Sequence, residues 1–354
     1  MTSVSGVGAG ARCSTGRRKL LKLSGLLGLS LLGSPLLPPE CAEALWFNRK
    51  NYKISRTRLS MGTFVSMTAI HDSQDQAEEA FAAAFAAIEE LASILSRHDQ
   101  SSPLAELNRS GRLEEAQDEL LLVVSRSLYY HNLTGGAFDI TVKPLMDLYQ
   151  QRFGAGQQPT EQEIEKILDL IGAAGLRLDS KAISFRQPNM GITLDGIAKG
   201  YIVDRASEVL RNRGITNHLV NAGGDIRTSG TAAGEKKWTI AIQDPAKQRE
   251  FPDILTMSDG AVATSGNYEA YYDQEKLFHH IVDPRSGLSP QHSASVTVRA
   301  RSVMVADALS TGAFVAQPVS GLHLVEAAAG PTYNAECLIL DRQGRRYASH
   351  GWDS

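Results

Sequence analysis

The sequence predicts an α+β fold in which mixed, largely antiparallel sheets pack against helices. Two observations carry this prediction. Strand-like alternation and helical periodicity both occur along the chain, but they do not follow the strict strand–helix–strand order of a parallel sheet. No linker-like composition divides the chain after its N-terminal segment. Residues 45–354 are therefore expected to form a single domain, preceded by a segment of different character at residues 1–44.

Four helices are predicted from apolar residues that recur at helical spacing. They cover residues 76–95, 118–133, 160–171 and 196–213. The third opens with a capping box of Thr160 and Glu163, in which each side chain satisfies a backbone amide of the other residue. Glycines follow the ends of the second and fourth helices, as helix C-termini prefer. The polar segment at residues 96–112 is expected to be a loop.

Strands are predicted mainly in the second half of the chain. An early strand is expected within residues 53–70, which alternate and end in a β-branched and aromatic run. The later strands are expected at residues 238–243, 260–264, 279–282 and 294–299. A helix at residues 302–315 follows them. The last two strands, 337–341 and 345–348, are expected to face each other across the turn Arg342-Gln-Gly344.

The composition is that of an ordinary globular protein. Of its 354 residues, 42% are hydrophobic and 21% are charged, and the net charge is −3. No basic excess is present that would attract nucleic acid, so no nucleic-acid partner is expected. The sequence contains neither a Cys-x-x-Cys pair nor a zinc-type spacing of Cys and His. Zinc-based functions are therefore disfavoured as well.

The N-terminus has the pattern of a secretory signal. Basic residues within 17–22 precede an apolar run at 23–37, and Ala42-Glu-Ala44 offers a small-x-small cleavage site. The pair Arg17-Arg18 resembles a twin-arginine signal, which predicts export of the folded protein. We expect cleavage after Ala44 and a periplasmic mature protein, because the apolar run is short and rich in glycine. An uncleaved signal would instead leave the protein associated with the membrane.

Cleavage would leave Cys337 as the single cysteine, because Cys13 and Cys41 lie in the signal. No internal disulfide is then expected, and the apolar run around Cys337 predicts that its thiol is buried. Cys41 is a weak candidate for lipidation, because Glu40 before it is not a small residue.

Glycine-containing runs could bring backbone amides close to a phosphorylated ligand. Residues 191–204 pass from a strand-like segment through a glycine into a helix, and residues 219–227 end a strand-like segment at Gly223-Gly224. Glycine has no side chain to hold a ligand away, and helix N-termini attract anions. Residues 263–268 add hydroxyls and a glycine turn. Each run is also compatible with an ordinary turn.

Three side-chain patterns suggest chemistry. Asp307 and Thr311 lie four residues apart and share a helix face, where a carboxylate and a hydroxyl suit Mg²⁺. His280 near a strand end is a candidate general base, because the ordinary pKa of histidine lies near neutrality. Phe138, in a glycine-rich helix end, could cover a flat ring. The alternatives are a solvent-facing Asp–Thr pair, a structural histidine and a core phenylalanine.

Taken together and in this order, these blocks closely resemble the ApbE family of FAD:protein FMN transferases. The resemblance spans nearly the whole expected mature chain. The matching blocks are Met61-Gly-Thr63, Gly136-Ala-Phe-Asp139, Leu194 to Tyr201 with Asp204, Asn221-Ala-Gly-Gly-Asp225, Ala263-Thr-Ser-Gly266, His280-Ile-Val-Asp-Pro284 with Gly287, and Asp307-Ala-Leu-Ser-Thr311. Each block is weak alone, but a fixed order of all of them is difficult to obtain by chance.

The resemblance implies that the FAD pyrophosphate is cleaved and FMN is joined to a Thr or Ser of an acceptor protein, with AMP released and Mg²⁺ required. It implies that His280 activates the acceptor hydroxyl. The implied metal ligands are Asp307, Thr311 and the backbone carbonyl of Ala198. The implied lining of the FAD site is Met61, Ala137, Phe138, Asp139, Asp195, Tyr201 and the Ile281 backbone. The expected acceptor is a flavoprotein subunit of a membrane-bound or periplasmic electron-transfer system.

The chain departs from the family pattern at two places in the expected site. The family often has an aromatic residue in the loop after the first helix, where this chain has Arg97-His98. Many members read Leu-Gly-Gly where this chain reads Leu194-Asp-Gly196, so Asp195 is expected to add a hydrogen-bond acceptor. The chain also has no clear Asp-x-x-Ser/Thr-Gly-Ala-Thr acceptor motif. It is therefore not expected to be the flavinylated partner itself.

Two other functions are compatible with the sequence. The protein could bind or carry FAD in the periplasm without transferring FMN, or it could be a Mg²⁺-dependent FAD pyrophosphatase in which water replaces the acceptor hydroxyl. His280 favours transfer over a carrier function, because a carrier needs no base. It does not separate transfer from hydrolysis, because the same base can activate water.

Overall fold

The computed structural model describes residues 45–48, 51–246, 251–268, 270–328 and 333–352. The signal predicted at residues 1–44 lies outside these ranges. Helices and antiparallel strands are combined without regular strand–helix alternation, so the predicted α+β class is confirmed. That residues 45–354 form one domain stays a prediction.

Within the described residues, nine strands form the main sheet in the order β1-β2-β3-β7-β8-β11-β12-β13-β14, and every neighbouring pair is antiparallel. The strands are β1 (Leu45–Asn48), β2 (Asn51–Ser60), β3 (Thr63–His71), β7 (His218–Ala222), β8 (Asp225–Ser229), β11 (Gly260–Gly266), β12 (Ser293–Ala300), β13 (Glu336–Asp341) and β14 (Arg346–Ala348). Strands β3 and β7 are neighbours in the sheet, although residues 72–217 separate them in the chain. Much of the site is built from those intervening residues.

The predicted early strand is in fact a hairpin of β2 and β3. Its two-residue turn is Met61-Gly62, with φ values of 52° and 71°. Turns in which both central residues have positive φ match the twist of paired strands. Alternation along β3 buries Val65, Met67 and Ala69 against the helices.

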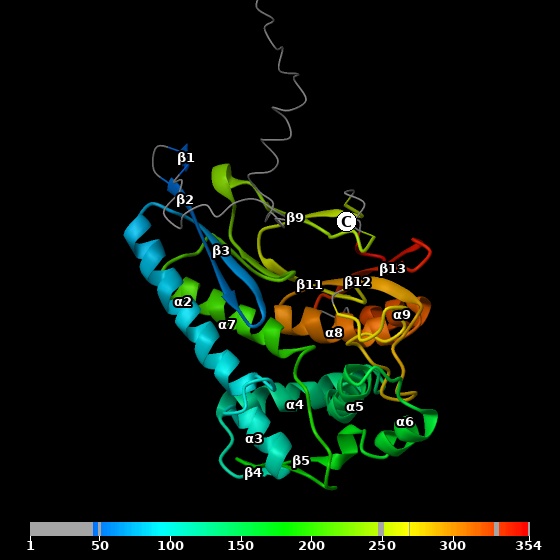
Figure 1. Ribbon diagram of the computed structural model, residues 1–354. Helices are drawn as coiled ribbons and strands as arrows, with labels where there is room; N and C mark the ends of the chain where they lie inside the picture. The colour runs from blue at the N-terminus through cyan, green and yellow to red at the C-terminus, as the bar shows by residue number, and fades with distance from the viewer. Residues whose placement is uncertain (1–44, 49–50, 247–250, 269, 329–332, 353–354) are drawn as a thin grey trace, which may run out of the picture.

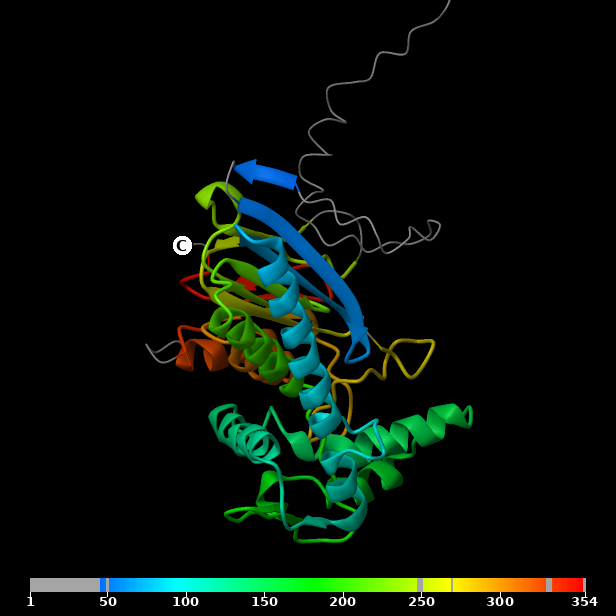
Figure 2. The ribbon, with the colours of Figure 1, turned by 90° about the vertical axis from the view of Figure 1, so that its left-hand side faces the viewer.

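Helices cover one face of the main sheet (Figures 1 and 2). They are α2 (Gln74–Leu95), α7 (Ala198–Asn212), α8 (Val303–Val315) and α9 (Pro318–Ala327). Helix α8 is buried on nearly all sides, because it lies between the sheet and a further helical layer. The other face of the sheet packs against a two-stranded sheet of β9 (Trp238–Ala241) and β10 (Ile254–Met257).

The further helical layer lies on the far side of α7 and α8 from the sheet (Figure 1). Its helices are α3 (Pro103–Ser110), α4 (Asp118–Leu133), α5 (Lys143–Gly154) and α6 (Glu161–Leu168), with a small sheet of β4 (Arg112–Leu113), β5 (Leu176–Leu178) and β6 (Ile183–Phe185). Short 3₁₀ helices are η1 (Ile140–Val142), η2 (Ala173–Gly175) and, beside β9, η3 (Ala233–Glu235). The candidate site lies between the two helical layers.

Several predicted elements are confirmed in detail. Helix α4 has the predicted bounds 118–133, and α8 begins at Val303, directly after its N-cap residue Ser302. Thr160 and Glu163 form the predicted capping box at the start of α6. Strands β13 and β14 pair across the predicted turn, and Cys337 is buried within β13.

Other predicted elements are wrong or were missed. The expected loop at 96–112 contains α3, which Ser102 caps and Pro103 opens; the helix is short and polar, so its periodicity is weak. The expected strand at 279–282 is irregular, with an isolated bridge between Tyr271 and His279. Helices α5 and α9, strand β10 and the small sheet were not predicted.

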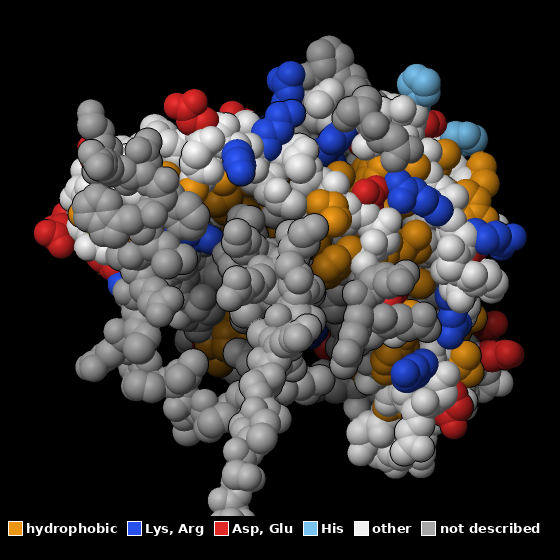
Figure 3. All heavy atoms as spheres, turned by 90° about the horizontal axis from the view of Figure 1, so that it is seen from above, with side chains coloured by type: hydrophobic (Ala, Val, Ile, Leu, Met, Phe, Trp, Pro, Cys, Tyr) orange, Lys and Arg blue, Asp and Glu red, His pale blue; other side chains and the backbone are white. Residues whose placement is uncertain are grey.

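The described surface has mixed charge. On the side of β9 and β10, acidic and basic side chains are interspersed with small apolar areas (Figure 3). Such a surface agrees with the net charge of −3. In the described ranges, no helix combines the length and the apolar character needed to cross a membrane.

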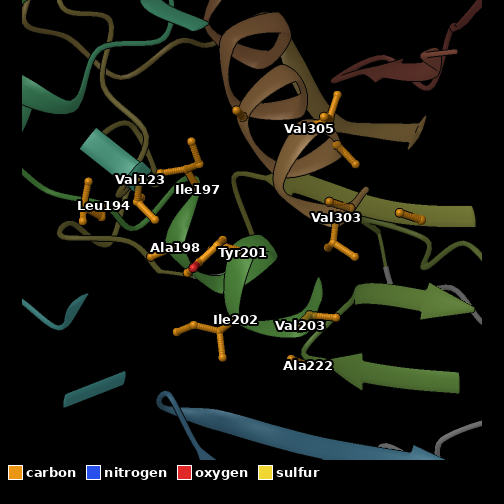
Figure 4. Packing of buried hydrophobic residues seen from close by; sticks show 14 of the residues in the cluster. Val123, Leu194, Ile197, Ala198, Tyr201, Ile202, Val203, Ala222, Val303 and Val305 are labelled. Carbon is orange, nitrogen blue, oxygen red and sulfur yellow. The ribbon is translucent and has the colours of Figure 1, made fainter. Parts of the chain in front are cut away.

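The N-terminal turns of α7 and α8 cross in close contact. A Cβ on Gly200 would lie 2.6 Å from the carbonyl oxygen of Val303 and 2.9 Å from the Cα of Met304. Apolar side chains surround the crossing, among them Ile197, Val203 and Val303 (Figure 4). Only glycine at position 200 allows the two backbones to approach this closely.

We expect Gly200→Ala to destabilise the protein by about 1–3 kcal/mol, because the added methyl group meets backbone that cannot move aside. Gly154→Ala is the matched control: this glycine ends α5, and a Cβ there meets nothing within 4 Å. The control should be neutral or stabilising by up to about 1 kcal/mol, through helix propensity. Urea unfolding measures both. Equal stability of Gly200→Ala and the wild type would contradict the described crossing.

Candidate functional site

A cavity lies where α7, α8, β11 and two irregular segments converge. The irregular segments are residues 137–142, which precede α5, and residues 280–282. Its lining residues include eight that the sequence predicted for the site: Ala137, Phe138, Asp139, Asp195, His280, Ile281, Asp307 and Thr311. Blocks separated by more than a hundred residues in the chain are thus brought together at one place.

Helix α8 contributes Asp307 and Thr311 to this cavity. The Asp307 side chain is buried, and one carboxylate oxygen accepts a hydrogen bond from the backbone N–H of Gly200 at 3.1 Å. Burial, together with the nearby Asp225 carboxylate, raises the pKa of Asp307 well above its ordinary range. The Thr311 hydroxyl lies 3.2 Å from that of Ser265 on β11. Asp307 and Thr311 therefore both face the cavity rather than bulk solvent.

The segment before α7 lies directly against α8. A Cβ on Gly196 would lie 2.9 Å from the Thr311 hydroxyl oxygen and 3.4 Å from the ring of Phe138. Glycine therefore allows this segment to pass between the two side chains. Immediately before it, Thr193 accepts a hydrogen bond from the Asp195 N–H at 3.2 Å.

Lys199 carries positive charge into the cavity. Its ammonium nitrogen lies 3.6 Å from a carboxylate oxygen of Asp225, which is buried at the start of β8. Gly223, two residues before Asp225, has a φ of 60° and lies against the side chain of Thr63. The end of the β2–β3 turn therefore packs next to the turn that precedes Asp225. Lys199 is thus paired with a residue that is distant in the chain.

Asp204 instead caps α8. Its two carboxylate oxygens accept hydrogen bonds from the backbone N–H groups of Val303 and Met304, at 3.0 and 2.9 Å. The Arg227 guanidinium lies 3.7 Å away. Burial raises the pKa of Asp204 to about 6. Asp204 therefore joins α7 to the N-terminus of the helix that carries Asp307.

Asp139 is held within the wall of the cavity. One carboxylate oxygen accepts hydrogen bonds from the N–H and the hydroxyl of Thr141, at 2.8 and 2.6 Å. The other lies 3.2 Å from Nδ1 of His131, and this carboxylate raises the pKa of that histidine. No sequence pattern indicates His131 as a site residue, because the pair forms across the Gly135-Gly136 turn.

The adjacent histidines have different surroundings. His280 lines the cavity, with Nδ1 3.4 Å from the carbonyl oxygen of Ala270. His279 is fully buried; its Nε2 lies 2.9 Å from the carbonyl oxygen of Pro290, and its backbone N–H donates to Ser289. Burial lowers the pKa of His279 to about 4. Because His279 is buried and hydrogen-bonded, we expect its substitution to destabilise the fold.

Three predicted site residues do not line the cavity. Ala198 is the first residue of α7, next to Lys199. Tyr201 is buried among core side chains, because two residues along a helix turn the side chain about 200° away from that of Lys199. Met61 occupies the β2–β3 turn and packs against the core. Their roles toward a flavin stay predictions.

The donor set around α8 fits a hard cation. No group of three or more His, Cys, Asp or Glu side chains suited to a metal occurs in the described part of the chain. Asp307 would therefore act with the Thr311 hydroxyl and a backbone carbonyl. Mg²⁺ is commonly held by one or two carboxylates while it keeps several waters and binds substrate phosphates. Burial removes water from the Asp307 carboxylate, and a bound cation would stabilise its ionised form in place of that water.

The burial of His279 predicts acid sensitivity. As the pH falls from 6.5 toward 4, the unfolded histidine binds a proton while the folded one does not, so stability is lost over this window. His279→Gln should cost about 1–3 kcal/mol near pH 8 and should remove part of the acid-induced loss. His280→Asn, the control, should change stability by less than about 0.5 kcal/mol. Urea unfolding at pH 8 and pH 5 tests this, and an unchanged pH slope in His279→Gln would contradict it.

Comparison with known proteins gives a consistent result. The profile of the ApbE family matches residues 61–335. A FAD:protein FMN transferase from Vibrio cholerae is 33% identical over 249 residues, which is 68% of this chain and 74% of that protein. Another, from Haemophilus influenzae, is 31% identical over 247 residues, covering 66% of this chain and 71% of that protein.

Solved structures of the same kind share the fold. The ApbE protein from Thermotoga maritima aligns with a TM-score of 0.76 at 29% identity, covering 85% of this chain and 98% of that one. The flavin transferase ApbE from Vibrio cholerae aligns with a TM-score of 0.72 at 26% identity, covering 86% of this chain and 99% of that one. On the family profile, the sequence identities and the shared fold, this chain belongs to the ApbE family.

Proposed function

We propose that the protein transfers FMN from FAD to a Thr or Ser hydroxyl of an acceptor protein and releases AMP. The observation that carries this proposal is the convergence of His280, Asp307 and Thr311 on one cavity. A base and a hard-cation site that line one cavity are parts that phosphoryl transfer needs. The relatives named FAD:protein FMN transferase support the same reaction.

The proposed metal is Mg²⁺, held by Asp307, Thr311 and the backbone carbonyl of Ala198. When bound, it would neutralise charge that develops on the pyrophosphate oxygens. The buried Asp307 carboxylate and the neighbouring Ser265–Thr311 hydroxyl pair support this assignment. Lys199, which faces the cavity from the start of α7, would add a second positive charge near the phosphates.

The flavin nucleotide is assigned to the rest of the cavity. Ala137, Phe138 and Ile281 supply apolar surface, and Asp139 and Asp195 supply hydrogen-bond acceptors. The Phe138 ring is itself buried, and it packs edge-on against Tyr130 with ring centroids 6.4 Å apart. Such packing fixes the orientation of Phe138 before a ligand arrives.

The chemical step forms one bond and breaks another at the same phosphorus. The acceptor oxygen bonds to the phosphorus of the FMN half, while that phosphorus loses its bond to the oxygen that leaves with AMP. The hydroxyl proton passes to the imidazole of His280. Because Nδ1 faces the Ala270 carbonyl, we assign this proton to Nε2.

His280→Asn is expected to transfer FMN about 10²–10⁴-fold more slowly, because it removes the general base. Its affinity for FAD should remain within a few-fold of the wild type. The assay combines the mature protein, FAD, Mg²⁺ and a flavoprotein subunit with a Thr/Ser acceptor, and it follows covalent flavin on that subunit. Normal transfer by His280→Asn would remove the base assignment.

The same assay separates the alternatives. Covalent flavin on the acceptor supports transfer. Free FMN and AMP, formed equally with and without the acceptor, would identify a pyrophosphatase in which water is activated at His280. Bound but unchanged FAD would identify a carrier. The position of His280 at the cavity favours the two catalytic outcomes over the carrier.

Asp307→Ala is expected to abolish Mg²⁺-dependent turnover, because no second carboxylate on α8 can replace it. Thr311→Val should raise the Mg²⁺ concentration needed for half-maximal activity by a smaller factor, because a neutral hydroxyl contributes less than a carboxylate. Titration of activity with Mg²⁺ measures both. Full activity of Asp307→Ala at limiting Mg²⁺ would contradict the metal assignment.

We also propose that the protein is exported folded to the periplasm and acts there on a flavoprotein subunit of an electron-transfer system. The support is the Arg17-Arg18 pair and the cleavage pattern ending at Ala44. Replacing both arginines by lysine should leave the precursor in the cytoplasm, as cell fractionation would show. Normal export of that variant would exclude the twin-arginine route while leaving a general secretory signal intact.

A further inference from the structure

An ion pair joins two distant segments at the edge of the cavity. Nε of Arg97, just after α2, lies 2.8 Å from Oδ2 of Asp195, in the segment before α7. The Arg97 side chain is 12% exposed and that of Asp195 is 45% exposed. An exposed ion pair commonly adds less than about 1 kcal/mol to stability. Solvent reaches this pair through Asp195, so we expect its contribution to fold stability to be small.

The charges around the cavity indicate another role for the pair. Asp139, Asp195 and Asp307 line it, and among its described lining residues Lys199 is the one Lys or Arg. Lys199 also lies beside the buried Asp225. Asp195 itself lines the cavity, so its charge acts on whatever binds there. Without a partner, Asp195 would repel an anionic ligand here.

We propose that Arg97 is a positioning residue for the pyrophosphate: it holds the Asp195 carboxylate to the side and offsets its charge. The inference rests on the proposed function, because it takes FAD as the ligand of this cavity. Arg97 acts through Asp195 and takes no part in bond making.

Asp195 is thus the member of the pair that lines the cavity, and Arg97 approaches it from the segment after α2. Loss of the Arg97 guanidinium would remove this counter-charge from the edge of the cavity.

The test is a double-mutant cycle with FAD as the probe. The variants are Arg97→Ala, Asp195→Asn and the double variant, and FAD dissociation constants are measured at fixed Mg²⁺ by quenching of flavin fluorescence. Arg97→Ala should weaken FAD binding about tenfold, the effect of one uncompensated charge in partly solvated surroundings. In the Asp195→Asn background the same change should cost less than about twofold, because the charge to be offset is gone.

Two further measurements separate this role from a structural one. The Arg97→Ala deficit should shrink between about 50 and 500 mM salt, because screening weakens repulsion, whereas a packing defect would persist. Arg109→Ala, which removes an arginine paired with Glu106 on α3, is the matched control and should bind FAD normally.

An equal loss of affinity from Arg97→Ala in both backgrounds would overturn the proposal, and so would no loss at all. If the wild type itself does not bind FAD, the proposed function fails instead, so the two failures are distinguishable. Thermal unfolding of each variant checks that the fold is retained.

Discussion

Gly200 brings the first turn of α7 into contact with the backbone of Val303 and Met304, and the geometry of the site depends on this crossing. On one side of the contact, the Gly200 N–H donates to Asp307; on the other, Asp204 caps α8. The two helices are thereby locked in register. The helix that carries Asp307 and Thr311 is fixed against the helix whose start carries Ala198 and Lys199.

The crossing also explains how acidic groups are accommodated in the interior. Asp204 is stabilised by two backbone N–H groups and by Arg227, and Asp225 by Lys199. Asp307 receives one backbone hydrogen bond, and its pKa is raised by burial and by Asp225. Of these three carboxylates, Asp307 faces the cavity, so it is the one that a bound cation can reach.

Sequence patterns predicted the parts of the structure that local chemistry determines. Helix α4 was bounded correctly, because its apolar spacing stops at Gly135-Gly136, and the capping box of α6 was identified from two residues. The strand predicted at 279–282 is wrong, because an apolar run predicts a strand whether or not another strand lies beside it. In the structure, hydrogen bonds such as that between the His279 N–H and the Ser289 hydroxyl replace strand pairing.

The site was predicted in outline through the order of its motifs, but its internal pairing was not. Lys199 and Asp204 lie five residues apart and suggest one another as partners, yet their actual partners, Asp225 and the start of α8, are distant in the chain. Arg97 and Asp195 are likewise brought together by the tertiary fold. Helical spacing places side chains on a face, but it does not say which segment that face will meet.

Anomalous diffraction from crystals grown with FAD and Mn²⁺ would test most directly whether the α7–α8 crossing builds the metal site. The account predicts a manganese peak bounded by the Asp307 carboxylate, the Thr311 hydroxyl and the Ala198 carbonyl, with the flavin nucleotide's phosphates beside it. A manganese peak coordinated by other residues, with flavin in the cavity and none at Asp307, would contradict it.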